Sequence, residues 1–236
     1  MRVLVTRPLE DAKETARLLE AMGHEGIIAP LLEIRFHDGL PVSLEGVQAI
    51  LATSANGVRA LARRTNERSV PVFCVGPQTA EAAKAASFAH IKSAGGDVKA
   101  LAEAISQWAS PDAGALLHAA GQETEGKLES DLARAGFSVR RETLYEAVAS
   151  VQLPEAVINA LGTSNLDAMF FFSPRSAKVF CQCVERAGLA AQTTSLTACC
   201  ISKNTADALS LSFRKVHIAL QPNQSALLDC LRGHPP

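Results

Sequence analysis

Short apolar runs alternate with helical periodicity along most of this chain. Runs of this kind, bounded by turn residues, are typical of strands buried on both faces of a parallel sheet. We predict strands at 2–6, 49–53, 72–75, 90–92, 115–118, 169–172, 197–201 and 215–219. A period of 3.6 residues predicts helices at 8–22, 55–64, 77–86, 97–108, 126–135, 154–161, 175–187, 203–211 and 224–231. This alternation predicts an α/β fold with parallel sheets and helices on both faces.

Three sequence motifs occur twice, in the same order, in the two halves of the chain. In two of them an apolar run leads into a small residue that can cap a helix, and in the third a helix ends at a glycine, Gly23 or Gly136. The separation within each pair stays close to half of the 236 residues. The repeats predict two diverged copies of one α/β unit. The matching segments are 72–80 with 196–206, 50–58 with 169–177, and 19–28 with 132–139.

Two long extended stretches, at 26–36 and 139–151, occupy matching places in the two copies. Pro30 has no N–H to donate to the centre of a sheet, so the first stretch can finish one sheet and continue beyond it. We interpret the two stretches as paired linkers. The predicted fold is therefore two parallel-sheet α/β domains of similar size, arising from an internal duplication and joined by a two-stranded linker.

The composition is ordinary for a folded globular protein, with 47% hydrophobic and 20% charged residues. A net charge of −1 gives no support to a nucleic-acid partner. No apolar run approaches the length of about 18 residues that a membrane span requires. Residues 1–8 lack the apolar centre of a signal peptide. We expect a cytoplasmic protein without membrane association.

Six cysteines are present, at positions 74, 181, 183, 199, 200 and 230. None belongs to a Cys-x-x-Cys pair, and no histidine has the spacing of a zinc finger, so we expect reduced, buried thiols and no metal site. The motifs Gly-x-Gly-x-x-Gly, Gly-x-x-x-x-Gly-Lys-Ser/Thr and Gly-x-Ser-x-Gly are also absent from the sequence. Dinucleotide, nucleoside triphosphate and serine-hydrolase sites therefore lack support.

Hydroxyl and cationic side chains follow the predicted strands, at the edge where ligands bind in parallel sheets. Helix N-termini at that edge also direct free N–H groups outward. The set is Thr6, Arg7, Ser54, Thr79, Ser173, Arg175 and Thr205. These groups predict binding of a ligand that carries several carboxylates or phosphates. The alternative is that each serine or threonine only caps its helix, which stabilises a helix by about 1 kcal/mol.

Two further side chains are candidates for chemistry. Tyr145, the only tyrosine, lies on the second linker, where its phenol could donate a proton to a departing hydroxyl. The alternative is amphipathic packing at a domain junction. His118 ends a predicted strand and could be catalytic, although the sequence favours a structural histidine with satisfied hydrogen bonds.

The motifs together resemble the uroporphyrinogen-III synthase family over essentially the whole chain. The resemblance rests on ordered segments at 3–8, 53–54 with the following helix, 75–80, 136–145, 172–174 and 201–206. It implies a first domain from residues 1–36 and 148–236, a second from 38–146, and linkers near 30–38 and 143–150.

The resemblance also implies an activity. Members of this family are hydro-lyases of tetrapyrrole (haem) biosynthesis that need no cofactor. They close hydroxymethylbilane to uroporphyrinogen III, with loss of water and inversion of ring D. The substrate carries several carboxylates, which agrees with the set of hydroxyl and cationic side chains above. Tyr145 matches the family's linker tyrosine, and the resemblance implies that it assists departure of the hydroxyl.

The chain departs from the family pattern at three places. Ser202 replaces a glycine before the second helix motif, and Ser87 and Leu211 stand where a glycine commonly ends a helix. A non-catalytic tetrapyrrole or small-anion sensor on the same two-domain clamp is therefore an alternative. A periplasmic solute-binding protein would share the hinged α/β layout, but the expected signal peptide is absent. We expect a monomer whose partner is a small polycarboxylate.

Overall fold

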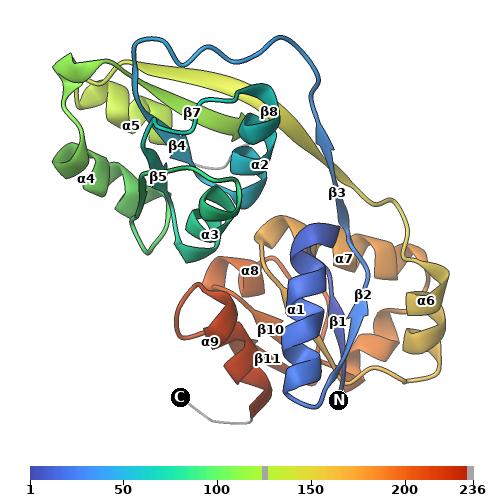
Figure 1. The fold of residues 1–236 in the computed structure, drawn as a ribbon. Helices are drawn as coiled ribbons and strands as arrows, with labels where there is room; N and C mark the ends of the chain where they lie inside the picture. The colour runs from blue at the N-terminus through green and yellow to red at the C-terminus, as the bar shows by residue number, and fades with distance from the viewer. Residues whose placement is uncertain (124–126, 233–236) are drawn as a thin grey trace. The chain divides into compact units, whose positions relative to one another are not determined.

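The computed structural model describes residues 1–123 and 127–232. The chain forms two compact units (Figure 1): unit 1 comprises Met1–Glu33 and Val148–Pro236, and unit 2 comprises Ile34–Ala147. The chain therefore passes from unit 1 to unit 2 after residue 33 and returns after residue 147. Each unit is an α/β structure built around its own sheet.

Unit 1 contains a five-stranded sheet in the order β11-β10-β9-β1-β2. Its four strand pairings are parallel, so the carboxyl ends of the strands lie along one edge. The strands are β1 (Arg2–Val5), β2 (Glu25–Ile28), β9 (Ala168–Phe171), β10 (Thr197–Cys200) and β11 (Lys215–Ile218). The helices are α1 (Leu9–Ala21), α6 (Glu155–Gly162), α7 (Pro174–Arg186), α8 (Lys203–Asp207) and α9 (Gln224–Asp229).

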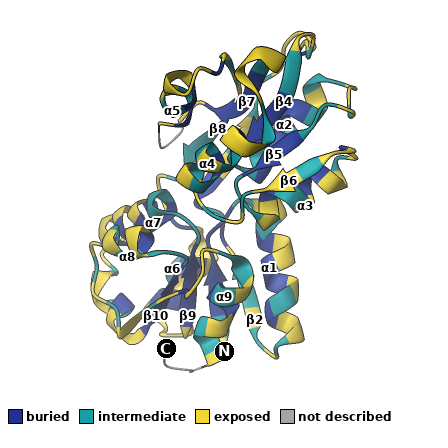
Figure 2. Cartoon of the chain, turned by 90° about the vertical axis from the view of Figure 1, so that its left-hand side faces the viewer, coloured by how far each residue is buried: buried dark blue, intermediate teal, exposed yellow. Residues whose placement is uncertain are grey.

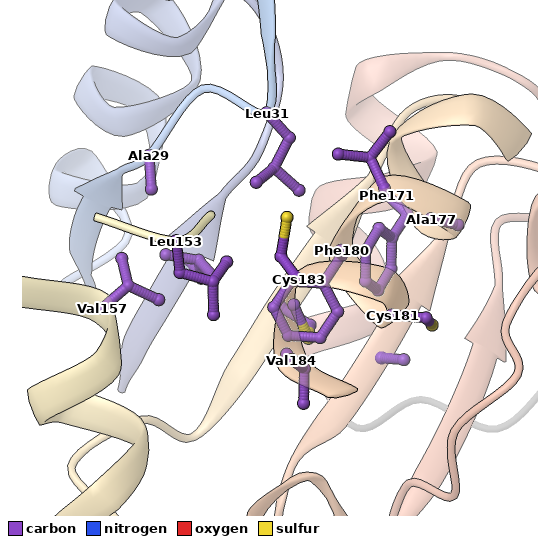
Figure 3. Close-up of a cluster of buried hydrophobic side chains, with 14 of the residues drawn as sticks. Ala29, Leu31, Leu153, Val157, Phe171, Ala177, Phe180, Cys181, Cys183 and Val184 are labelled. Atoms are coloured by element: carbon purple, nitrogen blue, oxygen red, sulfur yellow. The ribbon is translucent and has the colours of Figure 1, made fainter. Parts of the chain in front are cut away.

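Apolar side chains cover both faces of this sheet, because neighbouring strand residues point in opposite directions. On one face Phe171 of β9 packs with Phe180 of α7, and Figure 3 shows the side chains of α7 gathered beside it. On the other face Phe170 packs with Leu19 of α1 and Leu227 of α9. Figure 2 shows the central strands β9 and β10 buried among the helices of this unit. The continuous apolar runs of the sequence thus belong to central strands that are covered on both faces.

Unit 2 contains a six-stranded sheet in the order β3-β8-β7-β4-β5-β6. The pairings β4–β5, β4–β7, β5–β6 and β7–β8 are parallel. β3 lies at the outer edge beside β8, where the His37 N–H donates to the Leu144 carbonyl over 2.8 Å. The strands are β3 (Leu32–Phe36), β4 (Val47–Ala52), β5 (Val72–Cys74), β6 (Ile91–Ser93), β7 (Ala115–Gly121) and β8 (Val139–Ala149). The helices are α2 (Ala55–Arg64), α3 (Pro77–Ala85), α4 (Val98–Trp108) and α5 (Leu128–Arg134).

Two helix pairs cover the two faces of the unit 2 sheet. Leu117 of β7 packs in a cluster with residues of α2 and α3, including Leu61 and Ala83. Leu116 packs in a different cluster, with Leu101 of α4 and Leu132 of α5. Because alternate residues of a strand share a face, His118 of β7 lies on the side of α4 and α5.

Five strands follow the same spatial order in the two units. The order β2-β1-β9-β10-β11 of unit 1 corresponds, position by position, to β8-β7-β4-β5-β6 of unit 2. The repeated sequence motifs fall on corresponding elements, since β4–α2 takes the place of β9–α7, and β5–α3 takes the place of β10–α8. Helix N-caps also match, with Ser54, Gly76 and Asp97 in unit 2 and Ser173, Ser202 and Asn223 in unit 1.

Several local expectations are confirmed. Helix α2 has the predicted bounds, and Gly23 and Gly136 follow α1 and α5 in the left-handed conformation, with φ of 78° and 89°. Ser87 follows α3 with a φ of 65°, so the chain keeps the left-handed turn although glycine is absent.

Three expectations need correction. The helix predicted at 203–211 ends at Asp207, because Leu209 and Leu211 turn aside to pack against the cluster around Phe171. The strand predicted at 115–118 continues to Gly121. The extended stretch predicted at 26–36 is divided into β2 and β3 by the residues around Pro30. The predicted helix start at Gly126 lies outside the described residues.

Candidate active site

The hydroxyl of Tyr145 meets Ser54 at the carboxyl edge of the unit 2 sheet. Ser54 follows β4 and caps α2, where its Oγ accepts the N–H of Gly57 over 3.0 Å. The same Oγ lies 2.8 Å from the hydroxyl oxygen of Tyr145. Ser54 is therefore both a helix cap, as predicted, and a partner of the phenol.

A β-bulge in β8 directs the side chain of Tyr145. In the register of β7 with β8, Ala120 is paired with Thr143 but Gly121 is paired with Tyr145, so Leu144 is the extra residue. Leu144 and Tyr145 both pack against the cluster beneath α2 and α3, whereas regular alternation would place them on opposite faces. The bulge thus brings the phenol to the side of the sheet where Ser54 begins α2.

Gly121 provides the flat surface against which the ring of Tyr145 lies. A Cβ atom at Gly121 would come within 2.8 Å of Cζ and 3.0 Å of the hydroxyl oxygen of Tyr145. The shorter distance is below that of real Cβ contacts, so a side chain at Gly121 would require the phenol ring to shift; glycine serves close approach here rather than backbone freedom.

His118 forms a second polar group at the same edge. Its side chain is 2% exposed, and its Nδ1 lies 2.7 Å from Oε1 of Glu129 in the first turn of α5. Its Nε2 lies 3.2 Å from the hydroxyl of Thr53, the residue that precedes Ser54. Arg141 of β8 approaches the same Glu129 oxygen over 3.4 Å and donates to the carbonyl of Gly121 over 2.6 Å.

The directions of the pKa shifts of His118 and Glu129 indicate which of the two side chains is charged. Burial lowers the pKa of His118, and the neighbouring Glu129 opposes that change only in part. Burial alone would raise the pKa of Glu129, but the hydrogen bond with His118 and the charge of Arg141 outweigh burial, so the pKa is lowered. A neutral imidazole then faces a carboxylate. Because a carboxylate only accepts hydrogen bonds, we assign the proton to Nδ1, which leaves Nε2 to accept the hydroxyl proton of Thr53.

The sequence identified His118 and Ser54 separately and missed Thr53 as a partner, Glu129 and Arg141. His118 has satisfied hydrogen bonds at both ring nitrogens, as the structural interpretation expects. Nothing in the sequence marks Glu129 as a site residue, because acidic residues are common in the first turn of a helix, where the helix dipole favours them. Only the register of β7 with β8 brings Arg141 beside His118.

Thr79 lies in the first turn of α3, which begins as the sequence predicts. Gly76 is the N-cap, Pro77 is the first helical residue, and the side chain of Thr79 is buried. Its counterpart in unit 1, Thr205, is also buried, and its Oγ1 lies 3.0 Å from Oγ of the N-cap Ser202.

Thr6 and Arg7 have internal partners in unit 1. The hydroxyl of Thr6 donates to the carbonyl of Phe170 over 2.8 Å. The Arg7 guanidinium, 6% exposed, lies 4.0 Å over the ring of Phe172 and 3.5 Å from Asp11. It also donates to Gln224 over 2.5 Å. In this structure Arg7 therefore joins α1, α9 and the end of β9.

Ser173 and Arg175 lie together in the first turn of α7. Oγ of Ser173 accepts the N–H of Ser176 over 3.1 Å, which confirms the predicted cap. Arg175 is half-buried and is the second residue of the helix. The structure thus brings Ser54 and Tyr145 into contact, and it places Ser173 with Arg175 and Thr205 with Ser202 at the starts of neighbouring helices.

The cysteines and the acidic residues bear on metal chemistry. All six cysteines lie in described segments and none is bonded to another. Burial raises the pKa of the Cys74 and Cys200 thiols to about 12 in each case, so both are protonated. Among residues 1–123 and 127–232, no three His, Cys, Asp or Glu side chains are grouped as a metal site would require.

Within the described part of the chain, no helix is both long enough and apolar enough to span a bilayer.

Comparison with known proteins relates the chain to one family. The model of the family described as Uroporphyrinogen-III synthase HemD matches residues 13–229. A putative uroporphyrinogen-III synthase of Methanocaldococcus jannaschii is 37% identical over 90 residues, which cover 36% of this chain and 38% of that protein.

Solved structures share the fold. Uroporphyrinogen-III synthetase from Helicobacter pylori matches with a TM-score of 0.65 and 18% identity, over 98% of this chain and 99% of the other. A mutant uroporphyrinogen III synthase from Thermus thermophilus matches with a TM-score of 0.54 and 19% identity, over 98% of both chains. At such identities the likeness establishes the α/β fold alone. The match of the family model over most of the length shows more, and it confirms the resemblance seen in the motifs: this chain belongs to the uroporphyrinogen-III synthase family.

Proposed function

We propose that this chain is a uroporphyrinogen-III synthase, which closes linear hydroxymethylbilane to uroporphyrinogen III with loss of water and inversion of ring D. Membership of the family supports the reaction. The observation that carries the proposal is the contact between the hydroxyl of Tyr145 and Oγ of Ser54, the atoms that we propose lie beside the departing hydroxyl. A phenol beside a helix N-terminus, partly open to solvent, is suited to assist departure of a hydroxyl group.

In this proposal Ser54 is the donor in its contact with Tyr145. Oγ of Ser54 accepts the N–H of Gly57 and carries its own hydrogen, which it donates to the oxygen of Tyr145. The phenol O–H of Tyr145 then serves the departing hydroxyl. In the proposed first step the ring-A carbon–oxygen bond breaks, the electron pair leaves with the hydroxyl, and the hydrogen bond from Tyr145 stabilises the charge that develops on that oxygen.

The remaining steps need positioning more than further functional groups. Loss of the hydroxyl together with the ring-A N–H proton, as water, leaves an azafulvene. Ring D attacks it through its substituted carbon, and the spiro intermediate fragments and closes again. Because the bilane also closes spontaneously to the other isomer, the protein must hold its two ends in the productive arrangement. Effects of this kind reach about 7–11 kcal/mol. We propose no cofactor and no metal in these steps.

Helix starts are the proposed contacts for the substrate carboxylates. Ser54, Thr79, Ser173, Arg175 and Thr205 lie at the first turns of α2, α3, α7 and α8. Unpaired N–H groups and the positive end of the helix dipole favour anions at such places. Thr6 and Arg7 contribute indirectly in this proposal, because their polar groups contact Phe170, Asp11 and Gln224.

We further propose that the two units are diverged copies of one ancestral unit, joined by the extended segments near 30–38 and 143–150. The common strand order and the matching N-caps support the duplication. The division of the chain after residues 33 and 147 is compatible with domains at 1–36 with 148–236 and at 38–146. A monomer located in the cytoplasm remains our expectation.

A coupled assay tests the function. Hydroxymethylbilane is generated in place, the protein is added, and the products are oxidised and separated into type I and type III porphyrins. Predominant type III, in proportion to protein concentration, is the expected result. Type I alone, at the spontaneous rate, would remove the synthase activity and leave ligand binding as the role to be tested.

A further inference from the structure

We infer that Glu129 is a positioning residue for Tyr145, and that it acts through two separate chains of contacts. The inference rests on the proposed function, because it concerns the group proposed to assist departure of the hydroxyl. Glu129 lies on α5, on the opposite side of the sheet from the phenol, where it contacts His118 and Arg141. Its carboxylate is the place where both chains of contacts meet.

The first chain of contacts leads to the hydroxyl of Tyr145. Glu129 accepts from Nδ1 of His118, and Nε2 of His118 accepts from the hydroxyl of Thr53. Thr53 is joined by one peptide bond to Ser54, whose Oγ lies 2.8 Å from the phenol oxygen. Thr53 and Ser54 are consecutive residues at the end of an extended strand, so their side chains point to opposite sides of the sheet. Holding the side chain of Thr53 on one side of the sheet therefore also restricts the position of Ser54 on the other side.

The second chain of contacts leads to the ring of Tyr145. Arg141 lies 3.4 Å from the same Glu129 oxygen and donates to the carbonyls of Gly121 and Gln122 over 2.6 and 3.3 Å. Gly121 is the residue against which the ring packs. The N–H of Gln122 in turn donates to the carbonyl of Tyr145 over 2.7 Å. The guanidinium therefore fixes the turn that supports both the ring and the backbone of Tyr145.

The burial of His118 makes the Glu129 carboxylate hard to replace. With 2% of its side chain exposed, the imidazole has no access to water that could take the Nδ1 proton. In Glu129→Gln a neutral amide oxygen replaces the carboxylate, so the bond from Nδ1 of His118 loses its charge assistance and Arg141 loses its ion pair. A weaker bond leaves the imidazole less firmly held, and Thr53 and Ser54 then shift while the overall fold remains.

The test compares Glu129→Gln with Asp131→Asn. Both variants lie on α5 and exchange a carboxylate for an amide, but the partner of Asp131 among the described residues is the exposed Arg134. Tyr145 is the only tyrosine, so protein labelled with ¹³Cζ-tyrosine gives one signal that reports this phenol alone. We expect Glu129→Gln to shift and broaden the signal, and Asp131→Asn to leave it unchanged.

Turnover provides the second readout. Glu129→Gln should lower kcat for type III formation by about tenfold to a hundredfold with KM changed less than about twofold, because displacement of a reacting group mainly affects the transition state. Arg141→Lys, a milder change that interrupts only the second chain of contacts, should lower kcat less. An unshifted tyrosine signal in both Glu129→Gln and Arg141→Lys would overturn the inference.

Failure of the proposed function is distinguishable from failure of this inference. If wild-type protein forms no type III porphyrin, the synthase activity is refuted, yet the tyrosine signal still reports whether Glu129 controls Tyr145. If Glu129→Gln shifts the signal and leaves kcat at the wild-type value, the contacts exist but the positioning role is refuted. Should Glu129→Gln fail to fold, His118→Gln interrupts the first chain of contacts and Arg141→Lys the second, and the same tyrosine signal is compared.

Discussion

Gly121 lies so close to Tyr145 that a single Cβ atom at Gly121 would fall 2.8 Å from the Cζ atom of the phenol ring. The phenol ring has to move whenever Gly121 gains a side chain. The Gly121→Ala variant should therefore displace the phenol from Ser54 and lower kcat for type III formation by about a hundredfold.

The control for that variant is Gly162→Ala, which meets no atom within 4 Å. Gly162 ends helix α6, where alanine is favoured over glycine by up to about 1 kcal/mol. Its kcat should equal that of the wild type. Equal turnover in Gly121→Ala and Gly162→Ala would show that the ring position has no bearing on the reaction.

Arg7 should govern stability rather than substrate affinity. Its guanidinium is buried against Asp11, Gln224 and Phe172, and removing one member of a buried ion pair typically costs about 3–5 kcal/mol. Urea unfolding of Arg7→Met should show a loss of this order. Arg17→Met on the same helix, whose partner Glu14 is exposed, should lose less than about 1 kcal/mol. If Arg7→Met were folded and as stable as the wild type but had a strongly raised KM, Arg7 would be a substrate-binding residue instead.

Ser87 stores strain that glycine would release. Its φ of 65° lies in the left-handed region, which costs a residue with a Cβ atom roughly 1–2 kcal/mol. Part of that gain is offset by the greater freedom of glycine in the unfolded chain. Ser87→Gly should therefore raise the free energy of unfolding by about 0.5–1 kcal/mol in urea titration. A destabilised Ser87→Gly would mean that the hydroxyl makes a contact that outweighs the strain.

His118 should make stability depend on pH in a defined window. Its pKa is lowered by burial, so as pH falls below about 6.5 the unfolded chain takes up a proton that the folded chain refuses, and stability decreases. Glu129, Thr53 and Arg141 face the ring, and the lowered pKa of Glu129 adds a further loss only below about 4.5.

The measurement is the free energy of unfolding at pH values between about 7 and 5, for the wild type and for His118→Gln. Because the two proteins differ only at position 118, the difference between their curves isolates His118. The wild type should lose more stability than the variant across this window. Parallel curves would indicate that His118 takes up a proton in the folded protein as readily as in the unfolded chain.

The predictable part of the fold follows from local physical signals. The buried strands are continuous apolar runs, and the helix starts carry caps such as Ser54 and Ser173 whose side chains accept an N–H as expected. Helix α8 is shorter than its periodicity suggests because Leu209 and Leu211 gain more by packing against the core than by continuing the helix. Tertiary packing, which sequence periodicity does not contain, decided that boundary.

The sequence predicted some residues of the candidate site, namely Ser54, His118 and Tyr145, but it predicted neither Glu129 and Arg141 nor the contacts among these residues. Ser54 and Tyr145 were each identified, but their contact depends on the bulge at Leu144, which has no local sequence signal. The partners of Arg7 include Gln224, 217 residues away in the chain. The sequence therefore cannot distinguish a cationic residue that follows a strand and binds a ligand from one that, like Arg7, contacts three elements of its own unit.

The most direct test of the account is the rate of type III porphyrin formation by the wild type and by Tyr145→Phe, with circular dichroism to verify that both proteins are folded. Phenylalanine keeps the ring that packs on Gly121 and removes only the hydroxyl that contacts Ser54. The account predicts type III product from the wild type and a rate about a hundredfold lower from Tyr145→Phe. Equal rates in the two proteins would contradict it, because the hydroxyl at the centre of the proposed mechanism would then take no part in the reaction.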